Sequence, residues 1–155
     1  MDASDKRSIG QEMDVQLAES LRILESKLLS EEYKTVLESV DEDGNLVDTI
    51  AGRVINPGHC IETAWFLMDA APLYPDPQHV RELGLKIFDW DFEWGWDVQY
   101  GGIINFRDCR NFPPQDYSQD MKFWWPQCET VIAALYAYKI TGDEKYLEIH
   151  KRVHD

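Results

Sequence analysis

The feature that most constrains this chain is a helical spacing of apolar residues that recurs in five segments. In residues 11–29 the apolar positions are three or four residues apart, as on one face of an amphipathic helix. The same spacing returns in segments that begin near Pro57, Val80, Asp120 and Asp143. Because these helices follow one another without an internal repeat, the sequence predicts an all-α fold built from helical hairpins.

Capping residues mark the ends of the predicted helices. Asn56 is a suitable N-cap, and Pro57 occupies the first helical position, where a missing N–H does no harm. Gly95 ends the third helix and Gly142 ends the fourth. On the fourth helix we expect one stripe to face the core, formed by Trp124, Cys128, Val131, Leu135 and Tyr138.

Two segments have the composition of loops. In residues 41–45 the turn-forming residues include Gly44, which adopts positive φ without strain. In residues 98–117, paired glycines and paired prolines surround a short apolar run at Ile103 and Ile104. This second pattern predicts a long loop that contains a short β-hairpin.

Size and charge exclude several classes of protein. The 155 residues suffice for a single domain, and 44% hydrophobic residues rule out a disordered chain. With 15 basic and 29 acidic residues, the net charge of −14 disfavours nucleic acid and anionic membranes as partners. The absence of a long apolar run argues against a signal peptide or membrane span, and three scattered cysteines predict reduced thiols in a cytoplasmic protein. Their unpaired spacing also argues against a metal site.

The sharpest chemical feature is the segment 56–62, Asn-Pro-Gly-His-Cys-Ile-Glu. His59 lies in the first turn of its predicted helix, where the positive end of the helix dipole disfavours the imidazolium form. Glu62 follows three residues later on the same face and is able to orient the ring or bind a substrate hydroxyl. The alternative is a capping histidine in a purely local network.

A second feature is the segment 122–129, Lys-Phe-Trp-Trp-Pro-Gln-Cys-Glu. Adjacent residues cannot both face the core from one helix, so either Trp124 or Trp125 is free to stack against a sugar ring. Lys122 adds a hydrogen-bond donor, and Glu129 lies one turn beyond Trp125. The alternative places both indoles between helices and Glu129 in solvent.

A third feature is the aromatic and acidic segment 90–97, which contains three tryptophans. Rings interleaved with carboxylates are typical of carbohydrate-binding surfaces. The alternative is a helix end closed by Trp94 and Trp96. Both interpretations place these aromatic residues at a rim.

Three separated motifs, in residues 52–65, 95–102 and 122–129, resemble the N-acylglucosamine 2-epimerase family in order and spacing. The resemblance extends from about Val36 to Asp155 and corresponds to the central part of a longer family member. It implies part of an (α/α)6 barrel, a single domain over residues 1–155 that is incomplete at both ends. Such proteins interconvert N-acyl-D-glucosamine and N-acyl-D-mannosamine, and relatives epimerise cellobiose or isomerise free sugars.

The resemblance also implies a mechanism and site residues. The family removes the proton at C2 of the open-chain sugar, passes through an enediolate and returns a proton to the opposite face, which requires two bases. By motif match His59 is one base, Glu129 is an active-site carboxylate, and Glu62 and Trp124 contact the sugar. No cofactor is required, ATP activates some members allosterically, and a homodimer is left open.

The resemblance has gaps that affect the predicted activity. The second histidine of the family is expected after Asp155, and an arginine of the N-terminal hairpins is expected before Met1. We therefore expect this polypeptide alone to be weakly active or inactive, as a partial gene product or an incomplete gene model would be.

Two alternatives belong to other functional classes. The first is a noncatalytic carbohydrate- or protein-binding helical module, since one mammalian relative is known as a renin-binding protein. The second is a glycosidase on a similar barrel, with Glu62, Glu93, Asp97 and Glu129 as candidate carboxylates. The His59 motif argues against the glycosidase.

Overall fold

The computed structural model describes residues 3–114 and 116–154, and side chains from Glu12 onward. Its helices, in chain order, are α1 (Ala3–Ile23), α2 (Pro57–Ala70), α3 (Pro77–Gly95), α4 (Trp124–Thr141) and α5 (Glu144–His154). A π-helical turn, η1 (Leu24–Leu28), continues α1, and a 3₁₀ turn, η2 (Ala71–Leu73), follows α2. The expected all-α class is confirmed.

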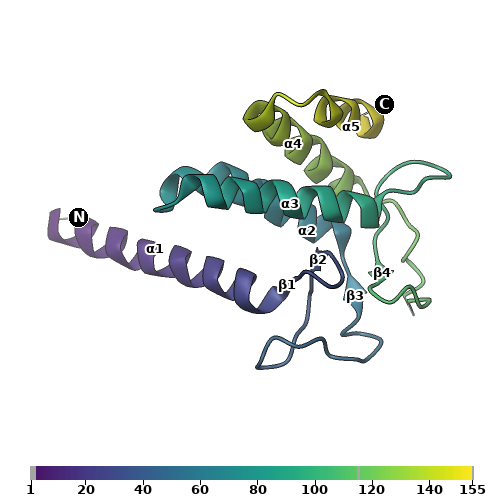
Figure 1. The fold of residues 1–155 in the computed structure, drawn as a ribbon, viewed down its shortest axis with the longest axis horizontal. Coiled ribbons are helices and arrows are strands. Elements are labelled where there is room, and N and C mark those ends of the chain that lie inside the picture. The colour runs from purple at the N-terminus through teal and green to yellow at the C-terminus, as the bar shows by residue number, and fades with distance from the viewer. Residues whose placement is uncertain (1–2, 115, 155) are drawn as a thin grey trace.

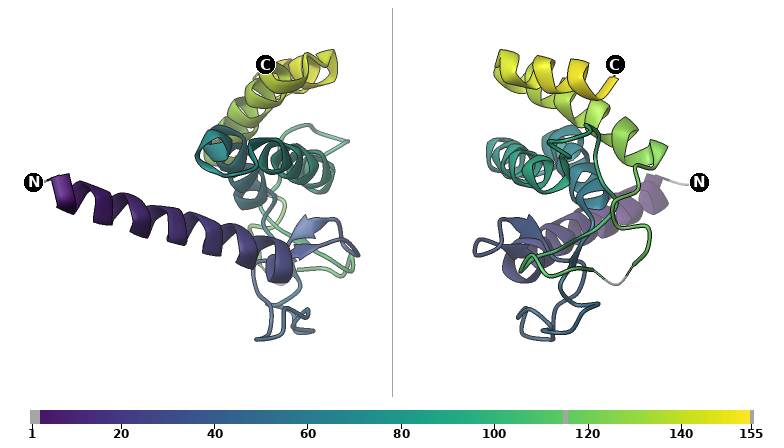
Figure 2. Two further views of the ribbon diagram at one scale, coloured as in Figure 1. Left: turned by 60° about the vertical axis from the view of Figure 1, so that its left-hand side comes forward. Right: turned by 90° about the vertical axis from the view of Figure 1, so that its right-hand side faces the viewer.

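The helices are arranged as two hairpins and one projecting helix (Figure 1). α2 packs against α3, α4 packs against α5, and α2 also packs against α4. The N-terminal end of α1 extends away from the other helices, as the left view of Figure 2 shows. The short strands and long loops gather at the end where α2 begins and α3 ends.

The core lies mainly between α2 and α3. Ile61 and Ile87 are fully buried there. Gly84 permits the close crossing of the two helices, because a Cβ at this position would stand 2.7 Å from the carbonyl oxygen of Ala64. Gly95 acts similarly at the end of α3, where a Cβ would stand 2.8 Å from the Cβ of Pro57. The end of α3 is thereby fixed against the beginning of α2.

The prediction of which residues of α4 face the core is wrong. Trp124 is 77% exposed, Leu135 is 38% exposed and Cys128 is exposed. The buried residues of α4 are instead Pro126, Thr130, Ala133, Ala134 and Ala137. Small side chains let α4 approach α2 and α5 closely, so volume rather than hydrophobicity selects the buried face. The helix also begins at Trp124 rather than near Asp120, and it ends before Gly142 at φ +70° as expected.

The hairpin expected in residues 98–117 has a different form. β4 (Arg107–Asp108) lies in this loop but pairs antiparallel with β3 (Val54–Ile55), which precedes α2. At the start of the loop, an isolated antiparallel bridge joins Trp96, the residue after α3, to Ile103. The side chain of Gln127 occupies the place of a hairpin partner, because its amide accepts from the N–H of Ile103 and donates to its carbonyl, both at 2.8 Å.

One further pair of strands lies between α1 and α2. β1 (Leu29–Ser30) pairs antiparallel with β2 (Thr35–Val36). The predicted turn at residues 41–45 is present, with Gly44 at φ +88°. In the part of the chain that the structure describes, no helix is long and apolar enough to cross a membrane, and the three cysteines form no disulfide.

Candidate active site

The candidate site is built on the first turn of α2, where His59 is held by an N-cap. The Oδ1 atom of Asn56 accepts a hydrogen bond from the backbone N–H of His59 at 3.2 Å, and Pro57 is the first helical residue. Asn56 is itself buried, with 4% of its surface exposed. The cap predicted from the sequence is confirmed, and it fixes the backbone beneath a side chain that is 53% exposed.

The carboxylate that contacts His59 is Glu38. The Nδ1 atom of His59 lies 2.9 Å from Oε1 of Glu38, a residue just beyond β2. The sequence suggested Glu62 as the group that orients this ring. Glu62 is half-buried one turn along α2, and its second suggested role, binding a substrate hydroxyl, stays a prediction. Glu38 carries no sequence signal of this contact, because 21 residues separate it from His59 and its segment has no clear periodicity.

Trp125 forms the aromatic side of the site. Its ring centroid lies 5.2 Å from that of His59, with the planes inclined by 35°. Gly58 makes room for it, since a Cβ there would stand 2.5 Å from the Cη2 atom of Trp125. Of the two adjacent indoles, Trp125 therefore packs beside the histidine and Trp124 points into solvent, which agrees with the expectation that they divide between two roles.

Glu129 is held between α2 and α4. Its Oε2 atom accepts a hydrogen bond at 2.6 Å from Nε1 of Trp65, a residue of α2. Further along the same pair of helices, one turn on α2 and two turns on α4, the hydroxyl of Tyr136 donates to Oδ1 of Asp69 at 2.6 Å. These bonds place Glu129 and Trp125 on neighbouring turns of α4 along its contact with α2.

Lys122 forms an ion pair with a carboxylate at the start of the loop that precedes it. Its Nζ atom lies 2.6 Å from Oδ2 of Asp97, and its ammonium lies 5.7 Å from the ring centroid of Tyr100. The hydrogen bond from Lys122, supported by the backbone N–H groups of Tyr100 and Gln99, lowers the pKa of Asp97 to about 2. The donor predicted to bind substrate thus fastens the two ends of the 97–122 loop together.

In the aromatic segment 90–97, Trp94 and Trp96 pack against the end of α3, as in the second of the two interpretations of this segment. The Nε1 atom of Trp94 donates to the backbone carbonyl of Tyr33 at 2.9 Å, and Trp96 stacks on Phe92 at 5.4 Å between centroids. The guanidinium of Arg152 covers the ring of Trp96 at 4.4 Å. These indoles close the end of α3.

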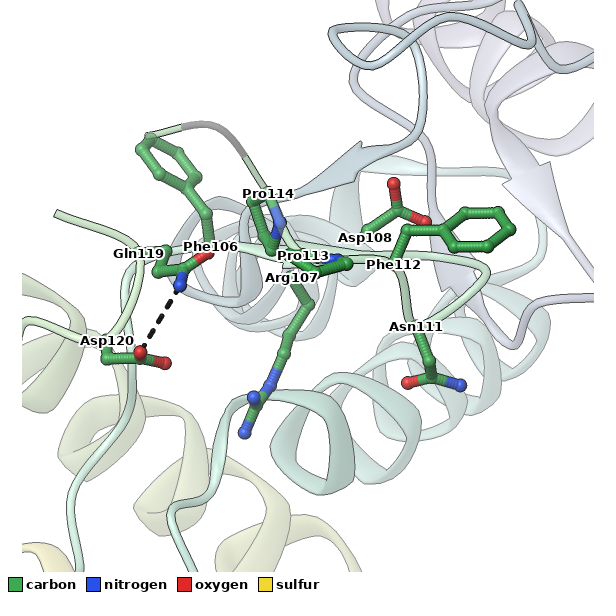
Figure 3. A pocket seen from close by; sticks show the side chains of 9 residues that line it. All are labelled: Phe106, Arg107, Asp108, Asn111, Phe112, Pro113, Pro114, Gln119 and Asp120. Atoms are coloured by element: carbon green, nitrogen blue, oxygen red, sulfur yellow. Dashed lines mark hydrogen bonds between the residues drawn. The ribbon is translucent and has the colours of Figure 1, made fainter. Parts of the chain in front are cut away.

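The cavity in Figure 3 lies apart from the predicted site residues. It has a volume of about 280 Å³ and is lined by residues of the loop 106–120. Arg107 and Asn111 extend beside it, and Gln119 donates to Asp120 at 3.4 Å. In the part of the chain that the structure describes, no three His, Cys, Asp or Glu side chains are grouped to hold a metal ion.

Comparison with known proteins identifies a family whose model matches most of the chain. Residues 13–155 match the model of the family described as N-acylglucosamine 2-epimerase (GlcNAc 2-epimerase). The chain is 38% identical over 120 residues to N-acylglucosamine 2-epimerase from Rattus norvegicus, covering 77% of this chain and 29% of that protein. It is 28% identical over 109 residues to cellobiose 2-epimerase from Ruminococcus albus, covering 67% of this chain and 25% of the relative.

The fold resembles a solved epimerase. The crystal structure of a sugar epimerase from a ruminal bacterium superposes with a TM-score of 0.74 at 24% identity, covering 93% of this chain and 35% of that one. The helical hairpins match part of the (α/α)6 barrel of such enzymes, as expected from the sequence. The chain spans less than a third of the length of the rat relative.

Proposed function

The chain belongs to the N-acylglucosamine 2-epimerase family, and from this membership we propose that it supplies one base of a sugar 2-epimerase. The substrate is an N-acyl-D-hexosamine in its open-chain form, and the base is His59. The proposed reaction interconverts N-acyl-D-glucosamine and N-acyl-D-mannosamine. The family supports this class of reaction, and the relatives that act on cellobiose mark the range of related sugars.

The contact of His59 with Glu38, in a ring that also packs beside Trp125, is the observation that carries the proposal. When Nδ1–H donates to the Glu38 carboxylate 2.9 Å away, the lone pair of the neutral ring resides on Nε2. A half-exposed ring in this form is able to accept a proton from a ligand. Trp125, beside the ring, offers an apolar surface for the C–H face of a sugar.

The proposed chemical step is removal of the C2 proton. The C2–H bond breaks, the proton moves to Nε2 of His59, and the electron pair of the bond forms the C1=C2 double bond of an enolate whose negative charge lies on the former carbonyl oxygen. Return of a proton to the same face regenerates the substrate, whereas inversion requires a donor on the opposite face. We therefore expect His59 by itself to support proton exchange but little or no epimerisation.

The other predicted site residues have supporting roles in this proposal. Glu129, held by Trp65, is a hydrogen-bonding or electrostatic partner of the sugar. Glu62 and Trp124 are proposed to contact sugar hydroxyls and the ring face, and Lys122 is proposed to act through the loop that it fastens. A noncatalytic carbohydrate-binding module is the second candidate function, because the 77% exposed Trp124 is available for stacking without any proton transfer.

Exchange of the C2 proton with solvent tests this function. The protein is incubated with N-acetylmannosamine in D₂O, with and without ATP, and deuterium at C2 is followed by NMR. We expect exchange in the wild type and its loss in His59→Ala. His79→Ala is the matched control, because His79 is also a first-turn histidine, 51% exposed and bonded to a glutamate. Equal exchange in wild type and His59→Ala would overturn the proposal, and sugar binding without exchange would favour the binding module.

A further inference from the structure

A buried polar cluster lies directly behind the site. The carboxyl group of Asp91 on α3 is fully buried, and its Oδ1 atom accepts a hydrogen bond at 2.5 Å from the hydroxyl of Thr35 on β2. Thr35 is also fully buried, and the thiol of Cys60 lies 3.7 Å from its hydroxyl. Within the described residues, Oδ2 of Asp91 is a buried oxygen without a hydrogen-bond partner.

A carboxyl group in this position is an unusual choice for a core. Burial raises the pKa of Asp91 to about 8, although the hydrogen bond from Thr35 acts in the opposite direction. At neutral pH the group is therefore mainly protonated and uncharged. An apolar residue would fill the same space without leaving a buried polar oxygen unpartnered. We therefore expect the carboxyl group of Asp91 to have a specific structural or functional role.

The cluster fixes the segment that carries Glu38. Thr35 is tied to α3 through Asp91, and the carbonyl of Val36 accepts from the Cys60 thiol at 3.3 Å. The N–H of Leu37 donates to the carbonyl of Leu28 at 2.8 Å. Each of the three residues before Glu38 is thus attached to a different neighbour. One of these neighbours, Cys60, is adjacent to His59 in the chain.

We propose that Asp91 is a positioning residue: its buried carboxyl group holds Thr35 and thereby sets the segment 35–38 so that Glu38 meets Nδ1 of His59. The inference rests on the proposed role of His59 as a base. It assigns Asp91 no contact with substrate. Its effect is on the tautomer of His59, because only a correctly placed Glu38 favours Nδ1–H over Nε2–H.

The test reads this tautomer directly from the imidazole ¹⁵N chemical shifts of His59 at a pH where the ring is neutral. We expect the wild type to show mainly Nδ1–H. Thr35→Val removes the hydroxyl at constant shape and should lose this bias, whereas Thr35→Ser should keep it. Asp91→Asn should also keep it, because the amide resembles the protonated carboxyl group. An unchanged tautomer in folded Thr35→Val would overturn the inference.

A pH titration provides a second measurement that needs no destabilised variant. Ionisation of Asp91 in the wild type should produce an inflection near pH 8 in the His59 signals, and Asp91→Asn should lack it. Cys60 is the other titratable side chain of the cluster, and burial raises its pKa well above the usual value near 9, outside this range. A titration curve of the His59 signals that is the same in the wild type and in Asp91→Asn would overturn the inference.

These readouts separate the inference from the proposed function. The tautomer is measured without a sugar, so a protein that shows no proton exchange but the expected tautomer changes contradicts the function and supports the positioning role. If proton exchange requires His59 but the tautomer is the same in Thr35→Val and wild type, the function is supported and the positioning role of Asp91 is contradicted. Circular dichroism of each variant establishes that it is folded.

Discussion

The first turns of α2 and α3 have nearly the same local structure, and only one of them forms a candidate site. Residues 56–59 and 76–79 both read as a capping residue, proline, one variable residue and histidine. In each, the side-chain Oδ1 of the capping residue accepts from the histidine N–H, at 3.2 Å for Asn56 and 3.1 Å for Asp76. Each proline occupies the first helical position.

The similarity extends to the side chains of the two histidines. The Nδ1 atom of His59 lies 2.9 Å from a carboxylate oxygen of Glu38, and the other ring nitrogen, Nε2, of His79 lies 2.5 Å from one of Glu25. Their exposed fractions are 53% and 51%. A capped first-turn histidine that contacts a glutamate thus occurs twice in the described structure, and it does not by itself indicate catalysis.

The difference lies in what surrounds each turn. Trp125 packs against His59 across the contact between α2 and α4, whereas no aromatic ring contacts His79 within the described residues. The segment that carries Glu38 is fixed by the buried Asp91 cluster, while Glu25 lies in the turn η1 at the surface. The second helical hairpin and the buried cluster therefore distinguish the candidate site from the similar cap at His79. Paired substitutions at matched positions test this distinction.

The largest expected effect on stability comes from the variable residue of each turn. Gly58→Ala places a Cβ 2.5 Å from the Trp125 ring, so it must displace the indole, and we expect destabilisation by about 1–3 kcal/mol. Gln78→Ala, at the matched exposed position, should change the free energy of unfolding by less than about 0.5 kcal/mol. Urea unfolding measures both, and equal effects would show that Trp125 is not tightly packed on this turn.

The capping residues are expected to have a smaller effect. Asn56→Ala and Asp76→Ala each remove one hydrogen bond to a first-turn N–H, so each should destabilise the protein by about 1 kcal/mol. Only Asn56→Ala should also alter the imidazole signals of His59, because its backbone is released at the site. NMR spectra of both variants check this. A His59 spectrum that responds equally to Asp76→Ala would contradict the independence of the two turns.

The sequence predicted the features that depend on local rules. Asn56 and Pro57 mark the start of α2, and Gly142 marks the end of α4, because capping and positive φ are set by a few adjacent residues. The motif around His59 also identified the centre of the candidate site. The same local rules do not distinguish His59 from His79, whose surroundings come from other parts of the chain.

The features that were missed depend on distant residues. Glu38 contacts His59, 21 residues away, and Asp91 contacts Thr35, 56 residues away. The spacing of residues along the chain does not predict contacts over such separations. The buried face of α4 was missed because alanines such as Ala134 pack more closely than the larger Leu135, which a hydrophobicity pattern favours. β4 pairs with β3, more than 50 residues earlier in the chain, and the backbone of Ile103 pairs with the side chain of Gln127, 24 residues later.

The smallest change in stability, and the sharpest test of the comparison, comes from the two glutamates. Glu38→Gln and Glu25→Gln each remove one exposed charge beside a histidine, so each should change the free energy of unfolding by less than about 1 kcal/mol. In the proton-exchange assay, however, Glu38→Gln should lower the rate on the order of 100-fold, because an amide N–H that donates to Nδ1 holds the ring as Nε2–H, in which Nε2 has no lone pair to accept a proton. Glu25→Gln should leave the rate unchanged. A similar rate in Glu38→Gln and wild type would mean that the contact at His59 is a cap and nothing more, and the two turns would then be equivalent in function as well as in structure.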